Sequence, residues 1–516
     1  MTGSFNLLDE PWVPVEDMTG VHRDVSVREL FAAAPRLRRL EGDLRTQTFA
    51  LHRLLLAILH RATDPDPSRW ATWWRTASLP LDQIETYLMA HHPRFDLLHP
   101  VRPFYQVADL RTTKGEFTEL ARLIGDAGSD YLSTRAHESI ASISLAEAAR
   151  WTVHCQAFDV SGIKSGAIGD GRVKGGKGYP IGVGAAGQIG GLLLEGESLL
   201  ETLLLNLVPQ DSGVEDFAAW ELEWGASTQF DASYRPTGRA EVLTWQSRRI
   251  RLEIQNDRAI GVLIANGDRF SPVNLDTVET MTAWRESKPQ AQKLGITTAF
   301  MPRLHVPGRS VWRGLEALIA SSREPGVVSW VESRVGERIL PEDFVPRVHT
   351  FGIDYVNQAS IVGDVVHDEI DLPVRVLQRV RPEMTQVVVG AVRDADAAAQ
   401  AFGNLASNLQ RAAGGDGTAR DTSRELLLAR LDEPFRRWLG SLASPQVGAT
   451  AAELAWARTL RGVALQSGSE AARDAGTAAW VGRIVNERHL DSGLAEAWYR
   501  QAIHKIVDTA TLEESA

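Results

Sequence analysis

The spacing of apolar and polar positions divides the chain into two regions. From residue 376 onward, apolar residues recur at helical spacing, Ala, Leu and Arg are common, and strand formers are few. This pattern predicts four helices, which cover residues 384–413, 421–442, 450–466 and 477–507. Gly414-Gly415 is a stop signal after the first helix, and Asp421-Thr422-Ser423 supplies cap residues for the second. Because the connectors are short, neighbouring helices should be antiparallel, which predicts a four-helix bundle.

The first 375 residues have a mixed pattern. Helical spacing is found in four stretches, which are residues 44–61, 68–75, 145–158 and 192–207. Strand-like runs are found at residues 242–243, 250–255 and 259–264, whereas residues 325–347 look irregular. We therefore predict an α+β protein, with a mixed α/β domain over residues 1–375 and a C-terminal four-helix bundle over residues 376–516.

Length and charge narrow the class of protein. A chain of 516 residues is too long for one compact core. Its net charge of −11 argues against a free-standing DNA-binding protein, because such proteins usually carry a basic excess. The region 376–516 holds 16 of the 55 basic and 17 of the 66 acidic residues, so most of the acidity lies in the first region. This net charge is compatible with a subunit that has a local basic site and whose partner chains supply most phosphate contacts.

Cysteine content and hydropathy indicate the compartment. Cys155 is the single cysteine, which excludes an intramolecular disulfide and a cysteine-based zinc site. A chain this poor in thiols fits the cytosol. The start of the sequence lacks the pattern of a signal peptide, and the most apolar stretch, residues 48–59, is interrupted by His52 and Arg53. We predict a cytoplasmic protein without a membrane segment.

The segment 161–191 is unusually rich in glycine, with 12 glycines in 31 residues. Between Ser161 and Pro180 it also contains one anion, Asp170, and four cations, which are Lys164, Arg172, Lys174 and Lys177. Glycine allows close approach of the backbone, and exposed N–H groups beside lysines favour phosphate. The segment is therefore a candidate nucleic-acid contact, and the alternative is a flexible surface loop.

Enzyme motifs in this segment match only in part. Residues 171–177 imitate the phosphate-binding GxxxxGK loop, but Gly178 stands where a Ser or Thr must bind Mg²⁺. A nucleotide-binding enzyme that uses Gly176-Lys177 is nevertheless the alternative function. Residues 182–187 fit GxGxxG, yet they follow a loop rather than a strand, which favours a structural loop.

Other candidate chemistry is sparse. His367-Asp368 would need further metal ligands in helical register, none is nearby in the sequence, and we interpret it as a surface pair. Cys155 lies on an apolar helix with His154 not facing it, which indicates a buried structural cysteine. Asn357-Gln358 in residues 357–361 either hydrogen-bonds base edges or caps a turn, and the residue types alone favour the turn.

Four segments, in this order, resemble the CasA family, the large subunit of the type I-E CRISPR surveillance complex Cascade. They are NLLDEPWVPV at residues 6–15, RPFYQ at 102–106, GIKSG at 162–166 and NQASI at 357–361. Arg102 replaces the histidine that the family usually has. The resemblance covers the whole chain, including the C-terminal helices.

The resemblance implies a non-catalytic subunit. The family recognises the protospacer-adjacent motif (PAM) in double-stranded target DNA, helps to open the duplex for R-loop formation, and helps to recruit the helicase-nuclease in antiviral defence. The implied partners are guide RNA, the other Cascade subunits, target DNA and that helicase-nuclease. A pure scaffold with an inert glycine loop is the remaining interpretation.

Matching positions imply roles for particular residues. The PAM-binding residues would be Ser161, Gly162, Ile163, Lys164, Gly166 and, in a looser match, Lys288. Asn357, Gln358 and Ala359 would form the duplex wedge, and Tyr131 would lie in the loop that tethers the family to the guide-RNA end. Some members carry cysteine pairs that could hold zinc. This sequence lacks them, so we predict no metal and no cofactor.

Overall fold

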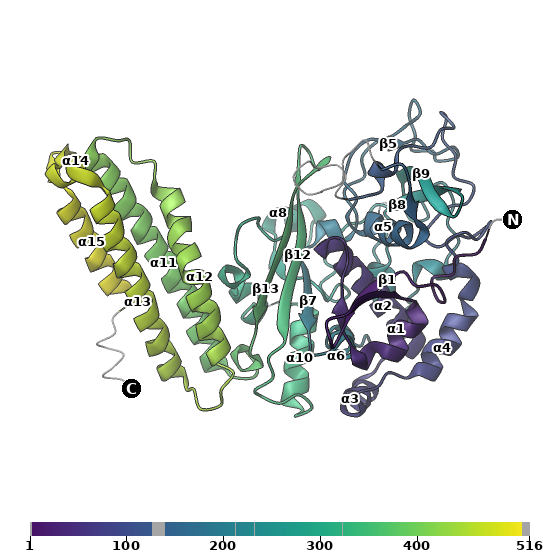
Figure 1. The fold of residues 1–516 in the computed structure, drawn as a ribbon, viewed down its shortest axis with the longest axis horizontal. Helices are drawn as coiled ribbons and strands as arrows, with labels where there is room; N and C mark the ends of the chain where they lie inside the picture. Colours follow the sequence, from purple (N-terminus) through teal and green to yellow (C-terminus); the bar gives the residue numbers. More distant parts are fainter. Residues whose placement is uncertain (1–2, 126–139, 212, 232, 322, 508–516) are drawn as a thin grey trace. The chain divides into compact units, whose positions relative to one another are not determined.

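The protein is described by a computed structural model that covers residues 3–507 apart from 126–139, 212, 232 and 322 (Figure 1). The chain forms two compact units. The first consists of residues 1–309, 323–331 and 347–369, and the second of residues 310–322, 332–346 and 370–516. The second unit therefore includes two segments that precede the boundary indicated by the sequence pattern.

A buried helix, α2 (Arg45–Thr63), lies at the centre of the first unit. Every residue from 46 to 60 is buried, including His52 and Arg53. The helix packs against α4 (Leu81–Ala90), α5 (Leu145–Phe158) and α7 (Arg239–Leu243), which explains why it is buried on all faces. Among the described residues, no helix reaches the length and apolar character that crossing a bilayer requires.

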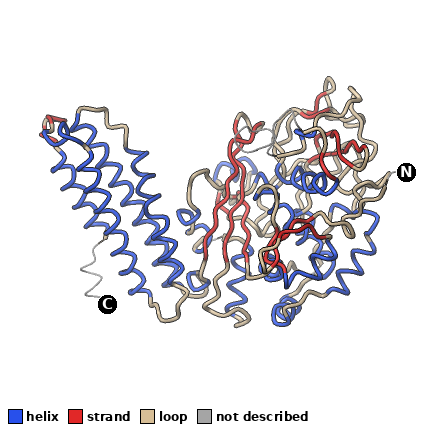
Figure 2. Tube along the Cα trace, in the orientation of Figure 1, coloured by secondary structure: helices blue, strands red, loops and turns tan. Residues whose placement is uncertain are grey.

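The strands of the first unit form small sheets (Figure 2). The three-stranded sheets have the orders β2-β1-β3, β4-β9-β8 and β13-β12-β7, and the two-stranded sheets are β5-β6 and β10-β11. The strand bounds are β1 Val13–Asp17, β2 His22–Val25, β3 Leu37–Leu40, β4 Ile143–Ser144, β5 Lys164–Ser165, β6 Lys177–Gly178, β7 Gly191–Glu195, β8 Arg248–Gln255, β9 Arg258–Asn266, β10 Trp284–Glu286, β11 Phe300–Pro302, β12 Arg347–Val356 and β13 Ile361–Asp371. The long strands β12 and β13 form one hairpin, and the sheet continues from β12 to β7.

Shorter helices complete the part of the chain before the bundle. They are α1 Val27–Ala33, α3 Pro67–Thr76, α6 Leu199–Asn206, α8 Lys288–Leu294, α9 Glu316–Ile319 and α10 Gly326–Gly336. Side-chain oxygens cap several of them, for example Ser144 at α5 and Ser198 at α6. The helices predicted at residues 44–61, 68–75 and 145–158 are confirmed as α2, α3 and α5, and the strands at 250–255 and 259–264 as β8 and β9.

The second unit is mainly a bundle of long helices. Their bounds are α11 Pro382–Ala413, α12 Arg420–Ser441, α13 Ala449–Asp474 and α15 Ser492–Ile506, with the short α14 Gly476–Val481, β14 Arg483–Val485 and β15 Arg488–Leu490 between the last two. Helix α11 packs against α12, α13 and α15. The α+β fold class with a helical C-terminal region is confirmed.

An aromatic cluster explains why residues 310–322 belong to this unit. Phe435 of α12 lies 5.1 Å from Trp456 of α13, between ring centroids. The buried Trp312 stacks on Phe435 at 4.5 Å and donates its indole N–H to Asp432 at 2.8 Å. The segment before α9 thus contributes a buried side chain to the core of the bundle. A sequence pattern read only over the helices could not reveal this contribution.

The helix predicted for residues 477–507 is wrong in its first half. Gly482, at φ +72°, ends α14, and a Cβ there would collide with the carbonyl oxygen of Leu490. A β14–β15 hairpin follows, with Asn486 and Glu487 in left-handed conformation. The fourth long helix is therefore α15 alone. The helix predicted for residues 450–466 extends further, to Asp474.

Three other predictions are wrong, and in the first two distant contacts decide the local structure. The run 192–207 is a strand followed by a helix, since β7 pairs with β12 before Ser198 caps α6. The apolar pair at 242–243 ends helix α7 rather than forming a strand. The distant Asp216 accepts hydrogen bonds from the first N–H groups of this helix, at Ala240 (2.9 Å) and Glu241 (3.0 Å). The segment 325–347 contains α10.

Candidate nucleic-acid interface

The glycine loop, which we define as residues 161–178, folds back on itself as a short hairpin. Lys164 of β5 lies opposite Gly178 of β6. Gly166 N–H donates to the carbonyl oxygen of Gly176 at 3.1 Å, and a Cβ at Gly166 would lie only 2.5 Å from that oxygen. Gly166 therefore fixes the shape of the loop, whereas the Ile163 side chain is 55% exposed.

Lys164 is held by a buried carboxylate. Its side chain is 12% exposed, and its Nζ lies 2.5 Å from Oδ2 of Asp159, the residue that follows α5. The same oxygen contacts Nε of Arg248, a fully buried residue of β8. Burial alone would raise the pKa of Asp159, but Arg248 and Lys164 outweigh burial and hold this pKa below its usual range. One anion and two cations leave a net charge of +1 beneath the loop.

The hairpin turn, residues 357–360, joins β12 to β13. Asn357, Gln358 and Ala359 all have left-handed backbones, with φ of 51°, 57° and 61°. Asn tolerates this conformation, but for other L-residues it costs about 1–2 kcal/mol each. Ser360 stabilises the turn, because its N–H and its hydroxyl both donate to the carbonyl oxygen of Asn357, at 3.2 and 2.7 Å. The segment does form a turn, and the Asn357 and Gln358 side chains remain exposed.

The glycine loop and the hairpin turn lie side by side, although 198 positions separate their bonded residues. Ser161 N–H donates to the carbonyl oxygen of Ala359 at 2.7 Å. Gly162 faces the turn, and a Cβ built there would lie 3.8 Å from Cβ of Ser360. The structure thus brings Ser161, Gly162 and the predicted wedge residues onto one surface.

Tyr355 anchors the hairpin to the end of α5. Its buried hydroxyl donates to the carbonyl oxygen of Phe158 at 2.7 Å, and burial raises the pKa of this phenol well above its ordinary value. A Cβ at Gly187 would overlap the Tyr355 hydroxyl, and one at Gly184 would overlap the backbone of Ala157. These glycines of the GxGxxG match therefore serve close packing, which agrees with the structural interpretation.

We expect Tyr355→Phe to lower the free energy of unfolding by about 1–2 kcal/mol, because a buried carbonyl loses its donor. Chemical denaturation of the full chain measures this. Tyr179→Phe is the matched control, since Tyr179 is 54% exposed and the same oxygen is removed. Equal midpoints for the two variants would contradict the anchoring role.

Two pockets open beside the loop. One, of about 350 Å³, is lined by residues of the loop, of α5 and of β13, including Asp159, Lys164 and Ile361. The other, of about 460 Å³, gathers one anion, Glu116, and four cations around glycine backbone, which are Lys114, Arg122, Lys164 and Lys177. Lys114 and Arg122 were missed by sequence reasoning, because they are isolated cations in a segment without a motif. A concave basic surface with exposed backbone suits phosphate groups.

Comparison with known proteins identifies the family. The sequence profile of the family described as CRISPR-associated protein Cse1 matches residues 6–467. This chain belongs to the Cse1 (CasA) family. The CasA/Cse1 protein of Thermus thermophilus is 30% identical over 495 residues, which cover 92% of this chain and 94% of that protein. The crystal structure of Thermobifida fusca Cse1 is similar with a TM-score of 0.91 and 41% identity over 98% of each chain.

The fold also recurs in an assembly. A chain of a solved CRISPR RNA-guided surveillance complex has a TM-score of 0.75 to this Cse1-family chain, at 17% identity, over 97% of this chain and 99% of that one. At this identity the likeness concerns the fold. The family resemblance indicated by the four motifs is confirmed.

Two of the four motifs turn out to stabilise the Cse1 fold. Asn6 accepts a hydrogen bond from Leu8 N–H at 3.0 Å and donates to the carbonyl oxygen of His92 at 2.9 Å. The buried Gln106 donates to Leu97 O and accepts from Leu252 N–H, both at 2.9 Å. Both side chains thus fix loops through backbone groups, whereas the glycine loop and the hairpin turn offer exposed groups to a ligand.

One predicted site residue of this Cse1-family chain, Lys288, is not bonded to the glycine loop in the part of the chain that the structure describes. Lys288 is exposed at the first position of α8, and no hydrogen bond or ion pair given for the described residues joins it to the glycine loop. Tyr131 lies outside the described residues. Their roles remain predictions from the resemblance.

The enzyme alternatives gain no support from the geometry. A phosphate-binding loop must lead into a helix, but Lys177 begins strand β6, after Gly175 and Gly176 at φ +58° and +71°. Burial raises the pKa of the Cys155 thiol, and burial lowers the pKa of His154 to about 4. A buried thiol with a raised pKa is a poor nucleophile.

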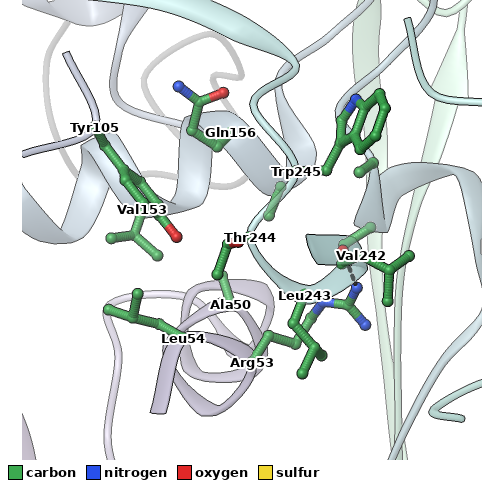
Figure 3. A pocket seen from close by; sticks show the side chains of 13 residues that line it. Ala50, Arg53, Leu54, Tyr105, Val153, Gln156, Val242, Leu243, Thr244 and Trp245 are labelled. Carbon is green, nitrogen blue, oxygen red and sulfur yellow. Dashed lines mark hydrogen bonds between the residues drawn. The ribbon is translucent and has the colours of Figure 1, made fainter. Parts of the chain in front are cut away.

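An enclosed pocket in the core is too small for a substrate. It measures about 20 Å³, room for one water, and lies among Arg53, Tyr105, Val242 and Trp245 (Figure 3). The Arg53 guanidinium donates to the carbonyl oxygen of Val242 at 3.0 Å and lies 2.8 Å from the Glu279 carboxylate. This is a buried structural ion pair rather than a catalytic group.

Proposed function

We propose that this Cse1-family chain is the large subunit of a type I-E CRISPR surveillance complex, Cascade, and that it recognises the PAM in target DNA. In this proposal the glycine loop contacts the minor groove beside the PAM, and the hairpin turn separates the first base pairs. Guide RNA then pairs with the opened strand, and the chain offers a surface to the helicase-nuclease. The chain itself performs no chemistry.

The observation that carries the proposal is the hydrogen bond between Ser161 N–H and the Ala359 carbonyl, which holds the glycine loop against the hairpin turn. A PAM reader that also opens DNA needs both groups at neighbouring base pairs. The minor groove is only about 6 Å wide and offers few distinguishing groups, so a slim loop that reads laxly suits it. Sequence discrimination then falls to guide pairing.

The charges near the loop also support the proposal. Lys114, Arg122 and Lys177 line the basic pocket and are exposed, although the whole chain carries −11. Such a local patch neutralises a few phosphates, and partner subunits supply most of the remaining contacts to the DNA backbone. The bundle of residues 376–516 is nearly neutral, and we propose that it contacts a neighbouring subunit and the displaced strand.

Gln358→Ala tests the wedge within the assembled complex. We expect R-loop formation on intact duplex to slow about tenfold, because stacking of one step is worth ~1.4 kcal/mol and the glutamine amide no longer satisfies an unpaired base edge. On a target with a pre-melted bubble beside the PAM, the variant should match wild type. The measurement is the R-loop rate on both targets.

Gln83→Ala provides the control, since it removes another exposed glutamine, on α4. Melting temperatures of both variants should equal that of wild type, because neither side chain is buried. Equal slowing on duplex and bubble, or no slowing on either, would show that the turn is only structural. If the complex with Gln358→Ala assembles and binds DNA normally, the result would favour the interpretation of the chain as a scaffold.

A further inference from the structure

Three potential metal ligands meet on the β12–β13 hairpin. Nδ1 of His349 lies 3.3 Å from Nε2 of His367 and 3.4 Å from Oε2 of Glu369, and all three ligand atoms lie within 4.8 Å of one another. The sequence prediction treated His367 as part of an isolated surface pair. The pair is not isolated in the structure, because His349 of the neighbouring strand lies beside His367, whereas the sequence interpretation sought partners in helical register.

These separations match a tetrahedral ion. Zinc binds imidazole nitrogen and carboxylate oxygen at roughly 2.0–2.2 Å, which places tetrahedral ligands about 3.4 Å apart. The two distances from His349 Nδ1 already have this value. The third edge, between His367 and Glu369, is no longer than 4.8 Å, and a side-chain rotation would shorten it.

The second nitrogen of His349 has the partner that a metal-binding histidine usually has. Its Nε2 lies 3.2 Å from Oε2 of Glu195 on β7, and Arg38 Nη2 lies 3.0 Å from Oε1 of the same carboxylate. A proton on Nε2 leaves the lone pair of Nδ1 directed at His367 and Glu369.

We propose that His349, His367 and Glu369 bind one divalent zinc-class ion, with water as the fourth ligand and Glu195 orienting His349. The two imidazoles favour zinc over magnesium or calcium, which prefer all-oxygen sites. The ion joins β12 to β13 far from the hairpin turn, and so clamps the base of the hairpin. The site departs from the sequence prediction of no metal, and it does not depend on the proposed function.

Titration of the chelator-treated full chain with zinc chloride tests the site. We expect one zinc per chain in calorimetry, a rise in melting temperature with zinc, and no response to magnesium or calcium. Cobalt(II) at the same site should give the visible absorption of a tetrahedral complex. His367→Gln should weaken zinc binding by about 100-fold or more and remove the thermal shift, whereas Glu195→Gln, a change beside the ligands, should weaken it about 10–100-fold.

Glu369→Gln is a second ligand variant, and its side chain is 48% exposed, so the fold should tolerate it. His489→Gln is the matched control, since His489 is an exposed histidine of β15. Zinc binding that is absent in wild type would overturn the proposal. So would binding that persists unchanged in both His367→Gln and Glu369→Gln, because that result would indicate an adventitious site elsewhere.

Discussion

Gly162→Asp is expected to abolish specific binding of a PAM-bearing duplex by the assembled complex, with affinity reduced at least ~100-fold, or about 2.7 kcal/mol. Gly162 has φ +157° and lies against Ser360 of the hairpin turn. An aspartate there strains the backbone, fills the space between loop and turn, and places a negative charge where phosphates approach. Filter binding or a mobility shift with the intact duplex measures the loss.

Gly171→Asp is the matched control for this experiment. Gly171 lies in the same loop, is exposed, and would accept a Cβ without any neighbour within 4 Å. It adds the same charge without touching the turn, so its effect should be small and should vanish at higher salt. If both variants lose binding equally, general repulsion explains the result and the position of Gly162 carries no special role.

Asp159→Ala is expected to lower the free energy of unfolding by about 3–5 kcal/mol, the largest stability effect of any single change near the interface. The substitution leaves the buried Arg248 without its anion, although this residue keeps carbonyl partners such as Gly182 O at 2.8 Å. Chemical denaturation measures the loss. Asp24→Ala, at a carboxylate 40% exposed beside Arg150, should cost less than 1 kcal/mol.

The same carboxylate predicts a pH dependence. The pKa of Asp159 is lowered in the folded state, so its contribution is fully present above the unfolded pKa of about 3.9. The contribution is lost as pH falls through the lower folded pKa. The stability difference between wild type and Asp159→Ala should therefore be constant near neutral pH and shrink in strong acid.

A double variant that also carries Arg248→Met should recover stability. A double variant that is no more stable than Asp159→Ala would show that the unpaired Arg248 does not cause the loss.

Much of the fold was predictable where local pattern and tertiary environment agree. Helix α5 was predicted with both its ends correct, because Ser144 caps it and apolar positions fill its turns. Helix α7 was missed, because Asp216, more than twenty residues earlier in the chain, satisfies its first N–H groups. The β14–β15 hairpin was missed because its two turn residues, Asn486 and Glu487, lack the glycine that usually marks such a turn.

The site was predictable as two separate motifs but not as one surface. Glycine content singled out the loop, and the family resemblance singled out Asn357 to Ala359. Nothing local in the sequence connects Arg248 with Asp159 and Lys164, since β8 lies some ninety residues away from α5. The same limitation hid the pair His349 and His367, whose alignment follows from strand pairing.

The bond between Lys164 and Asp159 has a consequence for how the complex responds to ionic strength. A lysine in water carries mobile counter-ions. When a protein neutralises a DNA phosphate, it frees cations that are condensed on the DNA, and this release increases its affinity. The logarithm of the binding constant therefore falls with the logarithm of the salt concentration, with a slope of about −0.9 per neutralised phosphate. Lys164 already has a fixed counter-ion within the protein. Under the proposed function its removal should therefore reduce the salt slope less than removal of the exposed Lys177, which should reduce the slope by almost one.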